Sequence, residues 1–153
     1  MTSLCCKVLE RLKGKTLVTA ESLTGGGIGA ALTAVSGSSA VYKGGVISYT
    51  NEVKHNILGV SNDTLSVFGA VSAQTAAEMA AGVRKLLNAD VSMSVTGLAG
   101  PGGDDYGNPV GTVFIGYCDA SQLLTREFHF EGDREMVRNQ TIEAALKLVL
   151  EYN

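Results

Sequence analysis

The sequence predicts a single α/β domain over residues 1–153, with a mixed β-sheet of about five strands covered by helices. Three observations support this fold class. The length of 153 residues corresponds to one domain of ordinary size. Helical and strand patterns alternate up to residue 95, as in parallel strands joined through helices. Two further strand patterns then follow one another closely, which indicates an antiparallel hairpin and therefore a mixed sheet.

The first third of the chain predicts two helices and two strands. Residues 4–12 place four aliphatic side chains on one helical face, namely Leu4, Val8, Leu9 and Leu12. Residues 16–20 form a short apolar run that predicts a buried strand. Small residues fill 28–35, which predicts a tightly packed helix, and a second strand is expected within 41–49.

The middle of the chain predicts three helices and a strand. Asn51 begins a short helix that ends near Gly59, and Ser61 caps a second short helix. Ser72 caps a longer helix, and a strand follows at 91–95. The inward face of the longer helix comprises Ala76, Met79, Ala80, Val83 and Leu87.

The last third predicts a loop, a hairpin and a helix. Residues 97–109 contain five glycines and both prolines, so they form a loop. Residues 110–117 and 123–130 predict the two hairpin strands, and the final helix runs from about Asp133 to Tyr152. Its inward face is expected to comprise Val137, Thr141, Ala144, Ala145, Leu148 and Val149.

Composition and charge exclude several classes of protein. Hydrophobic residues make up 45% and charged residues 18%, which excludes a disordered chain. The net charge of −3 gives no basic excess, so no nucleic-acid partner is expected. No apolar run approaches the roughly 18 residues of a membrane span, so no membrane partner is expected either.

The cysteines and the first residues predict a cytoplasmic protein. Cys5, Cys6 and Cys118 are odd in number, and none lies in a CxxC or Cys/His metal-binding pattern, so no metal is expected. Reduced thiols are typical of the cytosol. Charged residues interrupt any apolar run near the start, so no signal peptide is expected. These residues are Glu10, Arg11, Lys13 and Lys15.

Common catalytic motifs are absent. Gly14-Lys15-Thr16 lacks the earlier glycine of a phosphate-binding loop and precedes a strand instead of following one. The two histidines, His55 and His129, lie in no HExxH pattern. A Ser-His-Asp triad remains geometrically possible, although lone histidines are more often surface or packing residues.

A first candidate site motif spans residues 19–26, Thr-Ala-Glu-Ser-Leu-Thr-Gly-Gly, where an expected strand is followed by an expected helix. Ser22 there would lie near unpaired N–H groups and the positive end of the helix dipole, which can hold an oxyanion. The alternative is that Ser22 or Thr24 only caps the helix, and the residues alone favour that alternative.

A second motif is residues 49–54, Tyr-Thr-Asn-Glu-Val-Lys. A serine nucleophile needs a base, and Lys54 is the next candidate where no histidine is convincing. Its pKa, about 10.4 when unperturbed, would have to fall. For an arbitrary lysine, the more common situation is a surface residue paired with a carboxylate.

Two further segments suggest anion binding. Residues 95–103 run from a strand into a glycine-rich loop, whose N–H groups could face an anion or a planar ligand, although a flexible surface loop is the alternative. Arg134 and Arg138 are one helical turn apart and could together grip a phosphate. The alternative there is a solvated helix face with Asp133 as N-cap and Glu135 as a partner.

Together these segments resemble the CinA C-terminal domain family, in its stand-alone form with nicotinamide-nucleotide amidase activity. The resemblance covers about residues 4 to 150 and rests on short motifs in a fixed order. Besides the four segments above, they are Gly37-Ser38-Ser39-Ala40, Leu58-Gly59-Val60, Gly69-Ala70-Val71-Ser72 and Pro109-Val110-Gly111-Thr112-Val113.

The resemblance implies hydrolysis of the carboxamide of nicotinamide mononucleotide to nicotinate mononucleotide and ammonia, without a cofactor or metal. By position, Ser22 would be the nucleophile and Lys54 its general base, with Tyr49 and Thr96 positioning groups or relaying the proton. The turn Thr24-Gly25-Gly26 would supply the oxyanion hole. The substrate would also meet Gly97 and Gly100, and Arg134 and Arg138 would hold its phosphate. A homo-oligomer is implied as well.

One departure from the family pattern is Leu23, where most members have cysteine after the serine. Since Ser22 is the nucleophile, Leu23 need not abolish activity, although it changes the local packing. Three alternatives remain open from the sequence. They are a non-catalytic module that binds a pyridine nucleotide, an amidase for another small amide, and a competence-related partner protein.

Overall fold

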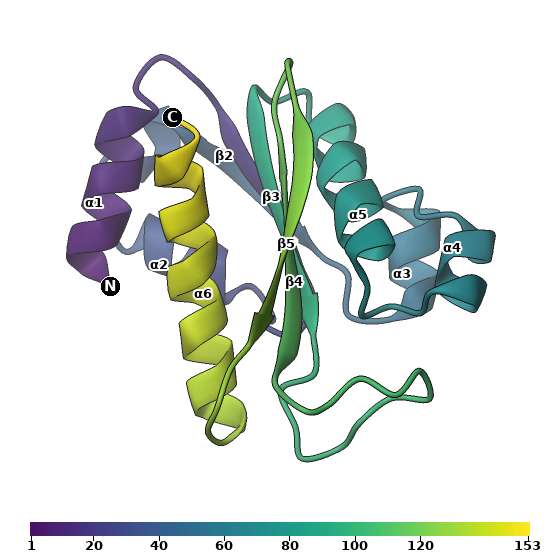
Figure 1. The fold of residues 1–153 in the computed structure, drawn as a ribbon. Helices are drawn as coiled ribbons and strands as arrows, with labels where there is room; N and C mark the ends of the chain where they lie inside the picture. Colours follow the sequence, from purple (N-terminus) through teal and green to yellow (C-terminus); the bar gives the residue numbers. More distant parts are fainter.

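The computed structural model describes all 153 residues and contains one five-stranded sheet between two layers of helices (Figure 1). The strands are β1 (Leu17–Glu21), β2 (Tyr42–Ile47), β3 (Val91–Gly97), β4 (Thr112–Cys118) and β5 (Leu123–His129). The helices are α1 (Thr2–Arg11), α2 (Gly27–Thr33), α3 (Asn51–Asn56), α4 (Asn62–Val67), α5 (Ala73–Leu86) and α6 (Arg134–Glu151), with a 3₁₀ turn, η1, at Ser38–Ala40. The expected element order and mixed sheet are therefore confirmed.

The sheet has the strand order β2-β1-β3-β4-β5. Strand β1 pairs in parallel with both β2 and β3, whereas β4 is antiparallel to β3 and to β5. Helices α1, α2 and α6 cover one face, and α3, α4 and α5 cover the other (Figure 1). The expected hairpin is thus the β4–β5 pair, and β2 and β5 form the two edges of the sheet.

Two hydrophobic clusters lie on opposite faces of the sheet because side chains alternate along a strand. Leu17 joins the cluster under α1, α2 and α6, while Val18 and Ala20 join the cluster under α4 and α5. On β3, the serines that alternate with apolar residues face α5. The hydroxyl of Ser92 donates to the Ala80 carbonyl and that of Ser94 to the Ala76 carbonyl, each at 2.6 Å. These buried hydroxyls are therefore satisfied by the helix that covers them.

The helix starts expected from the sequence are mostly confirmed. Ser61, Ser72 and Asp133 each accept a hydrogen bond from the N–H three residues later, as N-caps do. Strand β2, Tyr42–Ile47, lies within the expected range 41–49. One detail was wrong, because the buried face of α6 also includes Ile142 and Leu146. Helix α6 packs against α1, α2 and the sheet together, so its buried stripe is wider than expected.

The crossovers of the parallel strands place a crevice at the carboxyl ends of β1 and β3. The chain passes from β1 to β2 through α2 on one face, and from β2 to β3 through α3, α4 and α5 on the other. Neighbouring strands whose crossovers lie on opposite faces leave an opening outside their carboxyl ends. No helix in the structure has both the length and the apolar character needed to cross a membrane.

Candidate active site

Ser22 lies at the carboxyl end of β1, at the opening between the two crossovers. It begins a tight turn in which its carbonyl accepts a hydrogen bond from the N–H of Gly25 at 3.0 Å. The side chain is only 7% exposed, and the residue lines two adjoining cavities. Ser22 is therefore held on fixed backbone and still faces space that a small molecule could occupy.

Lys54 reaches the same point from α3, on the other face of the sheet. Its ammonium nitrogen Nζ lies 3.0 Å from Ser22 Oγ and 2.6 Å from the carbonyl oxygen of Ser48. A third contact, at 3.4 Å, joins Nζ to the carbonyl oxygen of Tyr49. The residue is 1% exposed, so the alternative of a surface lysine is wrong.

No carboxylate forms an ion pair with Lys54, so no negative charge offsets the loss of water around its ammonium group. Burial lowers the pKa of Lys54 from its ordinary 10.5 to about 8. A lysine with a pKa near 8 is partly neutral at physiological pH and can accept a proton. Lys54 beside Ser22 thus has the arrangement of a nucleophile and its base.

Thr96 and Tyr49 both lie at this site, but Thr96 is buried and Tyr49 is exposed. Thr96, on β3, is 1% exposed, and its hydroxyl donates to the Ala70 carbonyl at 2.7 Å. That proton is therefore already engaged, and the Thr96 oxygen retains only acceptor capacity. Tyr49 is 58% exposed, and its hydroxyl accepts a hydrogen bond from Arg134 Nη2 at 3.1 Å.

The start of α2 is capped by Glu21, a residue for which the sequence motifs predicted no role. The buried Glu21 carboxylate accepts the N–H groups of Ile28 and Gly29 at 2.8 and 3.1 Å. It also accepts the Thr24 hydroxyl at 2.7 Å. The alternative in which Ser22 or Thr24 caps the helix is therefore wrong. The signal was a carboxylate placed shortly before a helix start that lacks its own polar cap.

The glycine turn can adopt its backbone shape because two of its residues are glycines, which take positive φ angles without strain. Gly25 has φ +59° and Gly26 has φ +97°, in the left-handed region that residues with a Cβ rarely occupy. Thr24, Gly25 and Gly26 do not line the two cavities beside Ser22. The structure thus places these three expected binding residues behind the nucleophile rather than in the open space.

Arg134 and Arg138, which the sequence predicted to hold a phosphate together, form hydrogen bonds with different partners. Arg134 lines the cavity, and its Nη1 donates to the Gly100 carbonyl at 2.9 Å. Arg138 does not line it. Its Nε donates to the Leu23 carbonyl at 2.9 Å, and its Nη2 donates to the Thr24 carbonyl at 3.1 Å. The structure brings Arg134 to the open site and Arg138 to the back of the glycine turn.

The two cavities beside Ser22 have volumes of about 300 and 350 Å³. Five residues line both of them: Ser22, Tyr49, Gly97, Leu98 and Gly103. The first cavity extends along Gly100 to Arg134, and the second extends to Lys54 and Thr96. Ser22 therefore lies where the two spaces meet, so a ligand that reaches it can extend in both directions.

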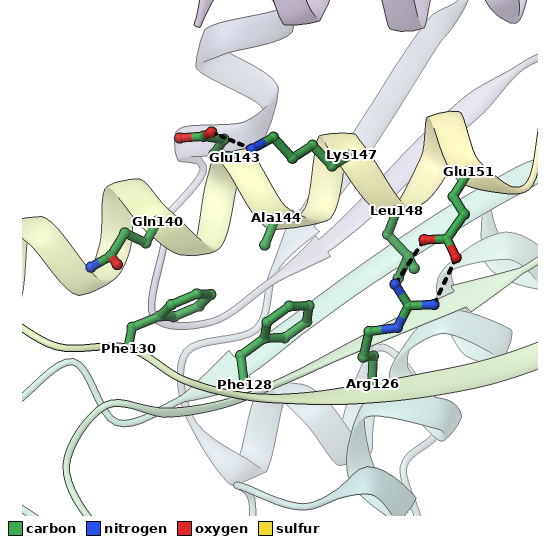
Figure 2. Close-up of a pocket in the computed structure, with 9 residues that line it drawn as sticks. All are labelled: Arg126, Phe128, Phe130, Gln140, Glu143, Ala144, Lys147, Leu148 and Glu151. Atoms are coloured by element: carbon green, nitrogen blue, oxygen red, sulfur yellow. Dashed lines mark hydrogen bonds and ion pairs between the residues drawn. The ribbon is translucent and has the colours of Figure 1, made fainter.

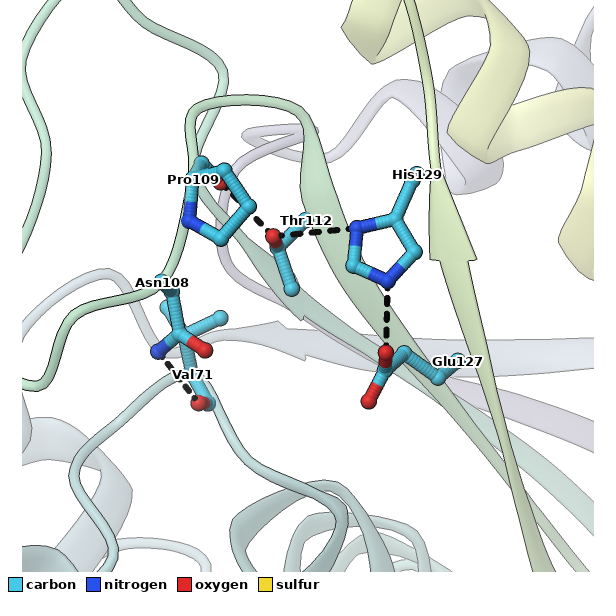
Figure 3. Close-up of polar contacts among 6 residues, drawn as sticks. All are labelled: Val71, Asn108, Pro109, Thr112, Glu127 and His129. Carbon is cyan, nitrogen blue, oxygen red and sulfur yellow. Dashed lines mark hydrogen bonds and ion pairs between the residues drawn. The ribbon is translucent and has the colours of Figure 1, made fainter.

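The loop between β3 and β4 is fastened to its surroundings. The Tyr106 hydroxyl donates to the carbonyls of Leu65 and Ser66 at 3.1 and 2.8 Å. The Asn108 side chain donates to the Val71 carbonyl at 3.2 Å (Figure 3). These contacts connect the loop to the layer of helices that carries Lys54, so the alternative of a flexible surface loop is not supported.

The histidines take no part in this arrangement. His129 contacts Thr112 through Nδ1 at 3.3 Å and Glu127 through Nε2 (Figure 3). His55 contacts the Val60 carbonyl and Asn62. Neither histidine contacts Ser22, so the triad that the sequence left open is not formed. The structure also gathers no group of three or more His, Cys, Asp or Glu side chains that could hold a metal ion.

A separate groove lies between β5 and α6, with a volume of about 490 Å³. Figure 2 shows Phe128 and Phe130 from the strand side facing Ala144 and Leu148 of the helix. Arg126 forms an ion pair with Glu151 at one end, and Glu143 pairs with Lys147. The groove contains none of the residues that the sequence singled out for chemistry.

Comparison with known proteins assigns the chain to a family. A profile of the CinA C-terminal domain matches residues 2–153. A relative from Halothermothrix orenii is 49% identical over 147 residues, which cover 95% of this chain and 35% of that protein. A CinA-like protein from Endomicrobium trichonymphae is 47% identical over 135 residues, which cover 88% of this chain and 32% of that protein. The chain thus spans about a third of the length of these curated relatives.

Solved structures agree with this assignment. The competence-damaged protein (CinA) superfamily protein from Escherichia coli has a TM-score of 0.97 and 37% identity, covering 99% of this chain and 90% of that one. The competence damage-inducible protein A from Klebsiella pneumoniae has a TM-score of 0.95 and 38% identity, covering 98% and 94%. The profile match across the whole chain, together with these structures, shows that the protein belongs to the CinA C-terminal domain family.

Proposed function

We propose that this protein is a serine amidase that hydrolyses the carboxamide of nicotinamide mononucleotide to nicotinate mononucleotide and ammonia. The observation that carries the proposal is the 3.0 Å contact between Lys54 Nζ and Ser22 Oγ, in a site where the lysine has no carboxylate partner. The substrate comes from the resemblance of the sequence motifs to the amidase members of the family.

The surroundings of Lys54 suit the neutral amine that a general base requires. A neutral amine has two N–H donors and one lone pair. The carbonyls of Ser48 and Tyr49 accept two donors, at 2.6 and 3.4 Å, and Ser22 Oγ is the remaining neighbour. With the donors used in this way, the lone pair faces the Ser22 hydroxyl and can accept its proton.

The reaction then proceeds through a covalent acyl-enzyme. Lys54 accepts the Ser22 proton as Oγ attacks the amide carbon, and the backbone N–H at the start of the turn after Ser22 stabilises the tetrahedral oxyanion. The C–N bond breaks, and Lys54 returns the proton to the leaving ammonia. Lys54 then takes a proton from water as the water oxygen attacks the ester carbon, and it returns that proton to Ser22 Oγ as the C–Oγ bond breaks and the carboxylic acid leaves.

The first cavity fits a substrate whose reactive amide lies at one end and whose remainder extends from Ser22 towards Arg134, and the second cavity brings Lys54 to that amide. The amide lies at Ser22, where the cavities meet, and the cationic pyridinium ring helps to keep the nearby Lys54 neutral. Arg134 retains N–H donors beyond its contacts to Gly100 and Tyr49, and it supplies positive charge for the phosphate at the end of the first cavity. Gly97 and Gly100 line the path between them.

The experiment that tests this function is an assay of the purified chain with nicotinamide mononucleotide, following both ammonia and nicotinate mononucleotide. Ser22→Ala and Lys54→Ala should each lose at least about a thousandfold in kcat. Ser66→Ala and Lys85→Ala are matched controls, because Ser66 on α4 and Lys85 on α5 are exposed. Both controls should keep wild-type activity.

A pH profile of the same reaction provides the second readout. The neutral form of Lys54 is the active base, so kcat/KM should rise with pH and reach half its plateau near the pKa of about 8. Turnover that survives Ser22→Ala refutes the nucleophile. Nucleotide binding without ammonia release from the wild type would instead support the non-catalytic binding module.

A further inference from the structure

Arg138 holds the peptide groups that directly follow the nucleophile. It lies in the first turns of α6, and its guanidinium donates to the carbonyls of Leu23 and Thr24 at 2.9 and 3.1 Å. No other hydrogen bond to the Leu23 carbonyl is present. A segment 115 residues away in the chain therefore fixes the turn that carries Ser22.

The rest of the turn has few other restraints on this side. The Gly25 N–H bonds back to the Ser22 carbonyl, and the Gly27 N–H bonds to the Thr24 carbonyl. By contrast, the N–H groups of Leu23, Thr24 and Gly26 make no main-chain hydrogen bond. Gly25 and Gly26 have positive φ angles and no side chains, so side-chain contacts from Glu21 and Arg138 help the turn to keep one geometry.

Peptide planarity links what Arg138 holds to where the free donors point. The C=O and N–H of a trans peptide face opposite directions. Arg138 holds the Thr24 carbonyl, whose peptide carries the Gly25 N–H, and that N–H donates to the Ser22 carbonyl at 3.0 Å. The Ser22 carbonyl belongs to the peptide that carries the Leu23 N–H, so Arg138 restrains the direction of this N–H through the Gly25 hydrogen bond. Leu23 lines the cavity beside Ser22. The N–H that follows a nucleophile is a common oxyanion donor in acyl transfer.

We propose that Arg138 is a positioning residue of the amidase site, which holds the turn after Ser22 so that the Leu23 N–H can stabilise the oxyanion. This inference rests on the proposed function. This inference gives different roles to two arginines that share one helix face. Arg134 lines the cavity and meets the phosphate, whereas Arg138 acts through the backbone and does not touch substrate.

An arginine suits this task better than a lysine. The planar guanidinium offers several N–H donors in a fixed fork and can therefore hold two neighbouring carbonyls at once. A lysine ammonium is a compact donor on a flexible chain, so at this position it can hold one carbonyl but cannot fix the relative orientation of two. Arg138→Lys thus keeps the positive charge and removes the two-point contact.

The kinetic test compares Arg138→Lys and Arg138→Ala with Arg134→Lys on nicotinamide mononucleotide. The Arg138 variants should lose about ten- to a hundredfold in kcat with KM changed less than about twofold, because oxyanion stabilisation acts only in the transition state. Arg134→Lys should mainly raise KM. Guanidinium ion added to Arg138→Ala should restore part of kcat. Arg138 variants that raise KM and keep kcat would overturn the proposal and support a direct phosphate contact.

A second readout keeps this proposal separate from the identity of the substrate. A fluorophosphonate probe reacts with an activated serine. The Ser22 Oγ–P bond forms, fluoride leaves, Lys54 takes the hydroxyl proton, and a phosphoryl oxygen occupies the position of the oxyanion. Ser22 should label more slowly in Arg138→Ala and Arg138→Lys than in the wild type, and at the wild-type rate in the control Arg126→Ala, whose ion pair with Glu151 lies in the separate groove.

The outcomes of the two experiments are distinguishable. A wild type that labels at Ser22 without hydrolysing nicotinamide mononucleotide contradicts the proposed substrate, and the labelling rates still test Arg138. Equal labelling rates in wild type and Arg138 variants overturn the positioning role, even where nicotinamide mononucleotide is hydrolysed. Thermal unfolding of each variant checks that the fold is retained, and Arg138→Lys serves where Arg138→Ala unfolds.

Discussion

Lys54 is the residue on which the proposed chemistry most depends, because it is buried without a counter-charge. Its folded pKa of about 8 lies below its ordinary 10.5, since the interior disfavours the ammonium form. A group that binds its proton less tightly in the folded protein destabilises the fold wherever the proton is present. The same burial that prepares Lys54 as a base therefore has a cost in stability.

The sign of this effect gives a prediction for Lys54→Met. Between pH 8 and 10.5 the unfolded chain holds more protons at Lys54 than the folded one, so wild-type stability rises with pH across that range. Relative to Lys54→Met, the free energy of unfolding of the wild type should be flat below pH 8. It should increase by about 2 to 3 kcal/mol towards pH 10.5. Urea unfolding of both proteins from pH 7 to 10.5 measures this, and parallel curves would contradict the lowered pKa.

At this scale the sequence motifs predicted the Ser22 and Lys54 pair, and the structure brings the two side chains into contact. They did not reveal Glu21 as the cap of α2 or the contact from Arg138 to Leu23. The Glu21 cap spans seven residues, and its local signal was a carboxylate shortly before a helix start that lacks a polar cap. The Arg138 contact joins residues 115 positions apart, so tertiary packing sets it and no local pattern records it.

Helix α5 shows how closely elements approach in the layer that supports Lys54. A Cβ built on Gly82 would lie 1.9 Å from the carbonyl oxygen of Leu58, and one on Gly116 of β4 would lie 2.5 Å from that of Ala76. These glycines let α5 approach both β4 and the segment that follows α3. The packing that positions α3, and with it Lys54, therefore depends on glycines, because any side chain at these positions would prevent the close approach.

This close approach predicts the effect of Gly82→Ala. In an exposed helix, Gly→Ala would stabilise by about 1 kcal/mol, since alanine has the higher helix propensity. Here the added methyl group meets backbone that cannot easily move, so a loss of about 1 to 3 kcal/mol is expected. Urea unfolding midpoints of Gly82→Ala and of the control Asn139→Ala measure this loss. Asn139 is exposed on α6, so its substitution should change the stability little. A stabilised Gly82→Ala would show that α5 does not pack this closely.

The order and type of the elements could be predicted because apolar periodicity and cap residues are local signals. The residues at which the elements end were predicted less accurately. Strand β3 continues to Gly97, where the expected strand ended at residue 95, because pairing with β4 extends it. Ile142 and Leu146 of α6 are also buried, in a helix that packs against α1, α2 and the sheet together. That burial depends on the arrangement of the whole layer.

Over the whole molecule, the site joins the two helical layers. Ser22 belongs to the connection into α2 on one face of the sheet, and Lys54 belongs to α3 on the other. The 3.0 Å contact between them forms only when both layers are packed against the same strands. The homo-oligomer that the family resemblance implies stays a prediction, for which sedimentation of the purified chain is the measurement.

This arrangement predicts that activity and structure are lost together. In increasing urea, amidase activity and the far-UV circular dichroism signal should fall in one transition with the same midpoint, as in a two-state domain of this size. A loss of activity at clearly lower urea than the loss of helix signal would show that the α3–α4 layer opens on its own. The comparison requires assays after equilibration at each concentration, with refolded protein as the reference.

The cap on α2 has a consequence for how a charged substrate of the proposed reaction would be recognised. A helix start usually attracts an anion from outside, but here Glu21 supplies that anion from within the chain and fills the place. The partial positive charge of α2 is therefore already neutralised before any substrate arrives. In the proposed reaction, single peptide donors then stabilise the developing oxyanion and the Arg134 side chain binds the phosphate, so the two negative charges are recognised independently.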